Sequence, residues 1–201
     1  MSRACRARLA CLAHNSRTTR YEIRATSYGR LVTNGNVGQA PSQNPVVRSI
    51  DIGVVRLCER LLHYDPPTED EVRQAREWVA RETKTAVAGM DNYQTATFVG
   101  TAGTITSLAA MAQNLPVHEP ARIHNYMLKL DTIRELEQTL LSRKKADRGG
   151  LPGLEKGREE VIAARAIIIR TVMETLGVED CLVSDLGLCE GVLIDLATRT
   201  R

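Results

Sequence analysis

The sequence predicts an α/β domain with a mixed sheet and flanking helices. Segments in which apolar and polar residues alternate are interspersed with segments in which apolar residues recur at helical spacing. A β-branched run over 95–100 passes through glycines directly into a helical pattern, which is typical of a strand followed by a helix. Apolar residues make up 43% and charged residues 25% of the 201 residues, as in ordinary soluble domains. No stretch approaches the roughly 18 apolar residues of a transmembrane helix, so we expect no membrane partner.

The amino-terminal segment is strongly basic. Residues 1–30 contain seven arginines and one acidic residue, and the remaining chain is mildly acidic. Because residues 1–20 show neither alternation nor a capping signal, we expect a disordered or decayed segment that does not pack on the core. The alternative is a decayed strand that pairs with residues 21–26, and an organellar transit peptide has a similar composition.

The cysteine and histidine residues indicate neither a disulfide framework nor a metal site. Five cysteines form an odd, scattered set without a CxxC pair. His63, His118 and His124 lie far apart and lack the spacing of metal ligands. Reduced thiols and a cytoplasmic location are therefore expected.

The first elements are predicted to be mainly strands. Residues 20–35 alternate well enough for a β-hairpin with its turn near Gly29. Residues 35–45 are rich in Gly, Pro, Ser and Asn and are predicted to be a loop. A strand and a short helical or irregular stretch follow from about residue 46 and end before Pro66.

Two helices and the strand between them have clear signals. Thr68 and Glu71 form a capping box that opens a predicted helix over about 69–88. Residues 95–100 are predicted to form a strand and residues 104–113 a helix. The glycines between these two elements are expected to make the turn at the carboxyl end of the strand.

The second half of the chain is predicted to be mainly helical. A helix is expected over 131–143, with Asp131 as its N-cap, and a glycine-rich, charged loop follows. A long helix is expected from residue 158, closed by Gly177. Residues 180–197 are predicted to form a strand, a glycine-containing turn and a last helix.

The sequence GTAGT, residues 100–104, is a candidate phosphate-binding turn. Small residues let backbone N–H groups approach an anion, and the following helix presents its positive end there. The hydroxyl groups of Thr101 and Thr104 would add hydrogen-bond donors. The alternative is an ordinary tight turn between a strand and a helix.

From about residue 48 onward the chain resembles the second half of the exopolyphosphatase and guanosine pentaphosphate phosphohydrolase (Ppx/GppA) family. The resemblance rests on four segments in the family's order and spacing: SIDIGVVRLCERLL, FVGTAGTITSLAAM, LPGLEKGREEVIAARAIII and LVSDLGLCEGVLIDL. It implies one lobe of an actin-like, ribonuclease-H-like ATPase fold, with residues 21–201 as the second lobe. It also implies release of terminal phosphate from polyphosphate or guanosine pentaphosphate, usually with Mg²⁺.

The resemblance implies a set of phosphate-binding residues but no catalytic or metal-binding ones. The expected phosphate ligands are Gly100, Thr101, Ala102, Gly103, Thr104 and Arg158. Arg158 has an alternative role in an ion pair with Glu155 or Glu159. In the family, the catalytic glutamate and the metal-binding acids belong to the first lobe, so no residue of this chain is assigned to catalysis or to Mg²⁺.

The chain departs from the family pattern at three places. Residues 14–26 stand where the family has a glycine-rich strand and turn, and Cys189 replaces a family arginine. Arg165 stands where the family usually has glycine, on the apolar face of its predicted helix. This arginine either reaches an anion in the cleft or is a destabilising substitution.

Two functions are therefore expected from the sequence. The first is a truncated or degenerate phosphatase lobe, active only with a missing first lobe or across a homodimer. The second is a non-catalytic module that binds phosphate or a partner chain. Neither includes a nucleic-acid partner, and in both the isolated chain is expected to show no appreciable turnover.

Overall fold

A computed structural model describes the backbone of residues 7–13, 21–27, 30–33, 36–39, 46–50, 52–89, 97–186 and 196. The side chains it describes are those of residues 50, 52–89, 97–186 and 196. Predicted features at other positions, which include Cys189 and most of the last expected helix, lie outside these residues. None of the described helices is both long and apolar enough to span a membrane.

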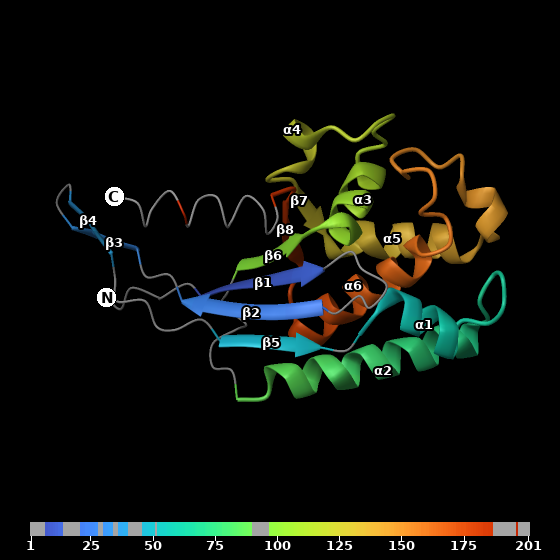
Figure 1. Cartoon of the computed structure of the whole chain (residues 1–201), viewed down its shortest axis with the longest axis horizontal. Helices are drawn as coiled ribbons and strands as arrows, with labels where there is room; N and C mark the ends of the chain where they lie inside the picture. Colours follow the sequence, from blue (N-terminus) through green and yellow to red (C-terminus); the bar gives the residue numbers. More distant parts are fainter. Residues whose placement is uncertain are drawn as a thin grey trace.

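The centre of the fold is a six-stranded sheet with the strand order β5-β2-β1-β6-β8-β7. Strand β6 lies parallel to β1 and to β8, whereas β1–β2, β2–β5 and β7–β8 are antiparallel (Figure 1). The mixed α/β sheet expected from the sequence is thus confirmed. The strands are β1 (Ala7–Ala13), β2 (Tyr21–Ser27), β5 (Val46–Ile50), β6 (Thr97–Thr101), β7 (Met127–Lys129) and β8 (Asp180–Ser184).

The structure differs from the expectation that residues 1–20 stay off the core. Strand β1 pairs along its whole length with β2, from Ala7 opposite Ser27 to Ala13 opposite Tyr21. It also pairs with β6, so it lies inside the sheet and its backbone groups find partners on both sides. This is the strand pairing that the sequence offered as the alternative. A strand inside a sheet can lack the alternation of a half-buried strand, and residues 7–13 do not alternate.

The predicted hairpin and loop over 20–45 are wrong in their pairing. Strand β2 does not pair with β3 (Arg30–Thr33), because its two neighbours are β1 and β5. Strand β3 instead pairs with β4 (Asn36–Gln39), which lies in the segment expected to be a loop. Two β-branched residues in register, Val32 and Val37, fit this short ladder, which the glycines and asparagines around it concealed.

The helices of the first half agree with the capping signals. Helix α1 (Val54–Leu61) is the predicted short helical stretch. Helix α2 (Glu69–Val87) begins at the predicted capping box, in which Thr68 and Glu71 bond to each other's backbone N–H groups. Helix α3 (Gly103–Ala112) follows directly from β6, as predicted.

Two helices of the second half begin at other residues than expected. Helix α5 (Leu130–Leu141) has Lys129 as its N-cap, so Asp131 lies in the first turn, where its carboxylate pairs with Arg134. Helix α6 (Ile162–Leu176) begins four residues after Arg158, because a turn in which Arg158 accepts from the Val161 N–H precedes it. The predicted end of α6 is confirmed.

Three further features complete the described fold. Gly177 follows α6 in the left-handed conformation, with φ of 66°. Helix α4 (Pro120–Ile123) and the 3-10 turn η2 (Lys145–Arg148) are too short to give a periodic signal in the sequence.

The core lies between the sheet and the helices, with α6 in contact with α1, α2, α3 and α5. Figure 1 shows α2 running alongside β5, with which it is in contact. Buried apolar residues come from every one of these helices and from β8; examples are Leu57, Val79, Ile105, Ile133, Ile167 and Val183. This core fixes the position of the turn between β6 and α3.

Candidate functional site

The turn from β6 into α3 places the GTAGT segment where the sequence predicted it. Ala102 has φ of 69° and ψ of 175°, a backbone conformation that is uncommon for a residue with a side chain. No side chain caps α3, and its first turn contains no acidic residue. The amino end of α3 therefore keeps the positive partial charge that favours an anion.

The two glycines of the turn are required for different reasons. A Cβ atom on Gly100 would lie 2.8 Å from Ile105 Cγ1 and 2.9 Å from the Cys181 sulfur, so this glycine lets β6, β8 and α3 pack closely. A Cβ atom on Gly103 would lie 2.9 Å from Nη1 of Arg158. Gly103 thus makes room for an arginine, whereas Gly100 makes room for the core.

Arg158 lies against this turn, as the sequence predicted. Its Nη1 donates to the Gly103 carbonyl at 2.8 Å and to Ser107 Oγ at 2.6 Å. Its Nη2 lies 2.8 Å from a carboxylate oxygen of Glu155, and its side chain is 24% exposed. Of the two roles considered from the sequence, the structure shows the ion pair with Glu155. The binding of phosphate by Arg158 stays a prediction.

Arg165 reaches the same carbonyl from α6. Its Nη1 donates to the Gly103 oxygen at 3.1 Å, and the residue is partly buried. Ser107 Oγ also donates to this oxygen, at 2.7 Å. Three side-chain donors from three parts of the chain thus converge on one carbonyl at the amino end of α3.

A buried arginine holds the loop that carries Arg158. Arg148 is 1% exposed, and it donates to the carbonyls of Leu140 at 3.0 Å, Arg143 at 2.8 Å and Glu159 at 3.2 Å. Burial lowers the pKa of this guanidinium. These three bonds tie the end of α5 to the residue that follows Arg158.

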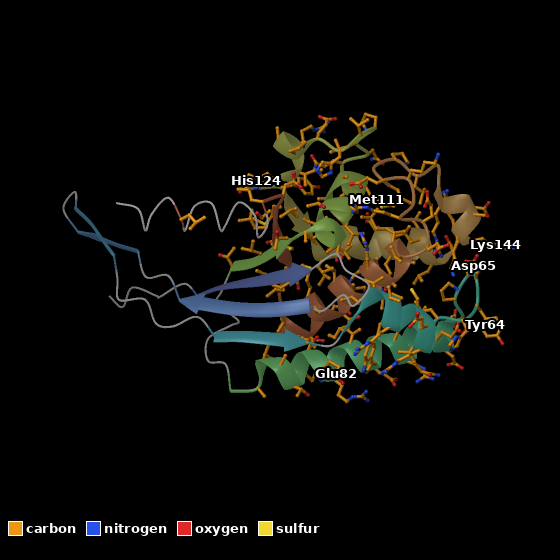
Figure 2. The ribbon with its side chains drawn as sticks, viewed as in Figure 1. Tyr64, Asp65, Glu82, Met111, His124 and Lys144 are labelled. Carbon is orange, nitrogen blue, oxygen red and sulfur yellow. The ribbon has the colours of Figure 1, made fainter. Side chains whose placement is uncertain are left out.

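Two other contacts fix the same loop. A Cβ atom on Gly153 would lie 2.4 Å from the backbone carbon of Ala110, so the loop rests directly on α3. Asp65 accepts from the backbone N–H of Lys145 at 3.0 Å, and it lies beside Lys144 at the far end of the molecule (Figure 2). Arg148 and Gly153 were not singled out from the sequence, because an arginine or a glycine in a charged loop gives no sign of burial.

His118 connects its own loop to the loop of Glu155 and to the segment that follows β8. Its Nε2 lies 3.2 Å from a carboxylate oxygen of Asp185, and its Nδ1 lies 3.5 Å from one of Glu155. Asp185 directly follows β8, and the next residue, Leu186, accepts a 2.7 Å hydrogen bond from Thr101 Oγ1. The histidine, which has no motif in the sequence, thus connects the residue after β8 to the loop that carries Arg158.

The hydroxyl groups of the turn are less available than the sequence suggested. Thr101 is 5% exposed, and its hydroxyl is already bound to Leu186. Thr104 is 3% exposed. The donors that the described residues offer at this turn are therefore mainly the backbone of α3 and the guanidinium groups.

The described residues do not fit a magnesium site. Within the described side chains, no three His, Cys, Asp or Glu residues come together in a group that could hold a metal. Mg²⁺ prefers several oxygen ligands, usually with one or two carboxylates among them. The described residues therefore offer no set of ligands for Mg²⁺.

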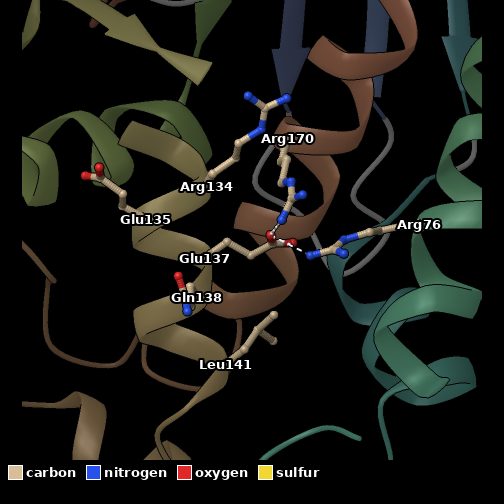
Figure 3. A pocket seen from close by; sticks show the side chains of 7 residues that line it. All are labelled: Arg76, Arg134, Glu135, Glu137, Gln138, Leu141 and Arg170. Carbon is tan, nitrogen blue, oxygen red and sulfur yellow. Dashed lines mark hydrogen bonds and ion pairs between the residues drawn. The ribbon is translucent and has the colours of Figure 1, made fainter. Parts of the chain in front are cut away.

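A pocket of about 390 Å³ lies between α2, α5 and α6, and residues other than those around the turn line it. Figure 3 shows Glu137 between Arg76 and Arg170, and both arginines bind its Oε2 atom. Because the carboxylate of Glu137 already binds both arginines here, we place the candidate site at the turn. The lining residues are Arg76, Arg134, Glu135, Glu137, Gln138, Leu141 and Arg170.

Comparison of the sequence with known proteins points to one family. Residues 38–200 match the Ppx/GppA phosphatase family. Exopolyphosphatase 2 of Mycobacterium tuberculosis is 35% identical over 153 residues, which cover 74% of this chain and 48% of that protein. A bifunctional 3-dehydroquinate synthase/phosphatase of Fusobacterium nucleatum is 25% identical over 154 residues, which cover 73% of this chain and 22% of that protein.

Solved structures agree in fold. The crystal structure of the Aquifex aeolicus Ppx/GppA family member matches with a TM-score of 0.78 at 27% identity, covering 98% of this chain and 58% of that one. An exopolyphosphatase from Cytophaga hutchinsonii matches in fold with a TM-score of 0.72 at 18% identity, covering 96% of this chain and 57% of that one. The fold is thus one part of the actin-like architecture of these proteins. The chain spans about half the length of the mycobacterial relative.

Proposed function

The chain belongs to the Ppx/GppA phosphatase family, and we propose that its β6–α3 turn binds terminal phosphate groups of polyphosphate or guanosine pentaphosphate. The observation that carries this proposal is the position of Arg158, whose guanidinium lies 2.8 Å from the Gly103 carbonyl at the uncapped amino end of α3. A guanidinium and a helix amino end are both favourable neighbours for a phosphate oxygen.

In this proposal the chain acts as the second lobe of a phosphatase. Phosphoryl transfer depends on positioning and on charge stabilisation around the transferred group. The described residues supply such groups from one side, namely the backbone of α3 and Arg158, with Arg148 and Gly153 fixing the loop. A first lobe, on another chain or on a second copy of this one, would supply the general base and the ligands of Mg²⁺, which neutralises phosphate charge when bound.

The first test is direct binding of phosphate. The full chain is titrated calorimetrically with tripolyphosphate, beside Arg158→Gln and, as a matched control, Arg73→Gln on the exposed face of α2. Loss of a charge-assisted contact is expected to weaken binding by about tenfold in Arg158→Gln, and the control is expected to bind like the wild type. Equal binding by all three proteins would contradict the proposal.

The second test is turnover. With Mg²⁺ and long-chain polyphosphate, the 201-residue chain is expected to release no appreciable phosphate by itself. Release at roughly 1 s⁻¹ or faster that Gly103→Asp abolishes would show that this chain holds a complete catalytic site. Adding a first lobe from a family member distinguishes the two candidate functions. A phosphatase lobe would gain activity, whereas a non-catalytic module would not.

A further inference from the structure

The ring of His118 lies between two carboxylate groups from separate parts of the chain. Its Nε2 atom lies 3.2 Å from Oδ1 and 3.3 Å from Oδ2 of Asp185, which follows β8. Its Nδ1 atom lies 3.5 Å from Oε1 of Glu155, in the loop before α6. The histidine side chain is 33% exposed, so it exchanges protons with water. The ring therefore bridges two acidic side chains and stays in contact with solvent.

Only the protonated ring can donate a hydrogen bond to both carboxylates. A neutral imidazole has one N–H group, and its other nitrogen presents a lone pair. In this geometry the lone pair would face a carboxylate oxygen, so one of the two contacts would become repulsive. Histidine is the side chain that ordinarily gains or loses its proton between about pH 5 and pH 8. The double contact therefore depends on a proton that is lost within this range.

The contact with Glu155 is the one expected to open when the proton is lost. Nε2 faces both oxygens of Asp185, whereas Nδ1 faces one oxygen of Glu155 at a longer distance. The other oxygen of Glu155, Oε2, lies 2.8 Å from Nη2 of Arg158. The carboxylate thus keeps a cationic partner after it leaves the histidine. The remaining N–H group of the neutral ring is expected to stay with Asp185.

The other charged groups near the ring agree with this expectation. Glu119, which follows His118 in the chain, lies 4.0 Å from a guanidinium nitrogen of Arg122. Arg158 lies on the far side of Glu155 and competes with the histidine for that carboxylate. The neutral ring cannot meet this competition, because it has lost the charge that attracts Glu155.

We propose that His118 is a proton-dependent switch for the loop over 149–161, which carries Arg158. The protonated ring holds this loop to the segment after β8, and the neutral ring releases it. The loop is expected to be held near about pH 5 and released near about pH 8. The inference concerns the motion of the loop, so it stands or falls independently of phosphate binding at the turn.

Hydrogen exchange of the full chain at about pH 5 and about pH 8 measures this release. Protection of the amides over 149–161 is expressed relative to the intrinsic exchange rate at each pH, because that rate itself rises with pH. Partly exposed ion pairs are weak, so we expect the protection to be about threefold lower at the higher pH. The amides of α6 report on opening of the whole fold and serve as the internal reference.

The decisive variant is His118→Gln, which keeps an N–H donor but takes up no proton. Its loop is expected to be equally protected at both pH values. The matched control is His63→Gln, at an exposed histidine before α2, which should keep the wild-type dependence on pH. Equal protection of the wild-type loop at both pH values would overturn the inference. A dependence on pH that persists in His118→Gln would overturn it as well.

Circular dichroism checks that the variants fold. If His118→Gln does not fold, Glu155→Gln decides the question, because it leaves His118 with Asp185 and removes the carboxylate that the switch releases. Protection of its loop is expected to be independent of pH. A wild-type dependence on pH in Glu155→Gln would show that the histidine does not act through this carboxylate, and the inference would be overturned.

Discussion

The carboxylate of Glu137, on α5, is fully buried and accepts hydrogen bonds from Arg170 on α6 and from Arg76 on α2. Its Oε2 atom lies 2.7 Å from Nη2 of Arg76. One buried acidic residue thus joins three helices that cover the sheet (Figure 3). The side chain of Arg76 is 33% exposed and that of Arg170 is 22% exposed. Each can therefore turn toward water if the carboxylate is removed.

Removal of this carboxylate is expected to destabilise the fold. Glu137→Ala leaves a cavity between three helices and removes the hydrogen bonds of two arginines that can turn toward water, so the free energy of unfolding should fall by about 1–3 kcal/mol. Urea denaturation followed by circular dichroism measures the change. The control is Arg73→Ala, whose ion pairs on α2 are exposed and whose loss should cost less than about 1 kcal/mol. A similar small effect for both variants would show that the cluster adds little stability.

The capping box of α2 should make stability depend on pH. Burial acts to raise the pKa of Glu71, but hydrogen bonds from the backbone N–H groups of Thr68, His63 and Tyr64 outweigh it, so this pKa lies below its ordinary value. A carboxyl group with a lower pKa in the folded state stabilises the fold above its unfolded pKa of about 4.3. The stabilisation is lost as the pH falls through the folded pKa.

The variant Glu71→Gln removes this titration. At pH 7 it is expected to lower the free energy of unfolding by about 1 kcal/mol, as loss of a cap does. The difference between variant and wild type should shrink as the pH falls below about 4. Thermal unfolding at several pH values provides the comparison, and a difference that is constant from pH 7 to pH 3 would contradict the assignment.

Substitutions at the two glycines of the turn are expected to have different effects, one on stability and the other on phosphate binding. Gly100→Ala forces a Cβ atom against Ile105 and the Cys181 sulfur, so we expect a clear loss of stability, of about 1–3 kcal/mol. Gly103→Ala meets the end of an arginine side chain, which can move, so the fold should stay nearly as stable while tripolyphosphate binding weakens. Melting temperatures and calorimetric titrations of both variants test this. If both variants changed stability and binding to the same extent, the distinct roles of Gly100 and Gly103 would be contradicted.

Local patterns in the sequence were enough for several elements. The capping box of Thr68 and Glu71, the switch of period at Gly100 and the left-handed Gly177 are each set by residues within a few positions of one another. The family resemblance led us to expect Arg158 as a phosphate ligand; the structure shows its contact with Gly103, and its binding of phosphate stays a prediction. Backbone propensity and short-range hydrogen bonds decide such features, so the chain order alone reveals them.

Tertiary structure decided the rest. Strand β1 has its place because β2 and β6 pair with it, whereas residues 7–13 lack the alternation that indicates a half-buried strand. The burial of Arg148 depends on three carbonyls, two at the end of α5 and one in the loop before α6. The contact of Arg165 with Gly103 depends on the approach of α6. The sequence determined the strand, the turn of small residues and the helix over 97–112. The packing of the loop and of α6 determined which arginines face this turn, because a guanidinium takes its function from the partners that the fold places within its reach.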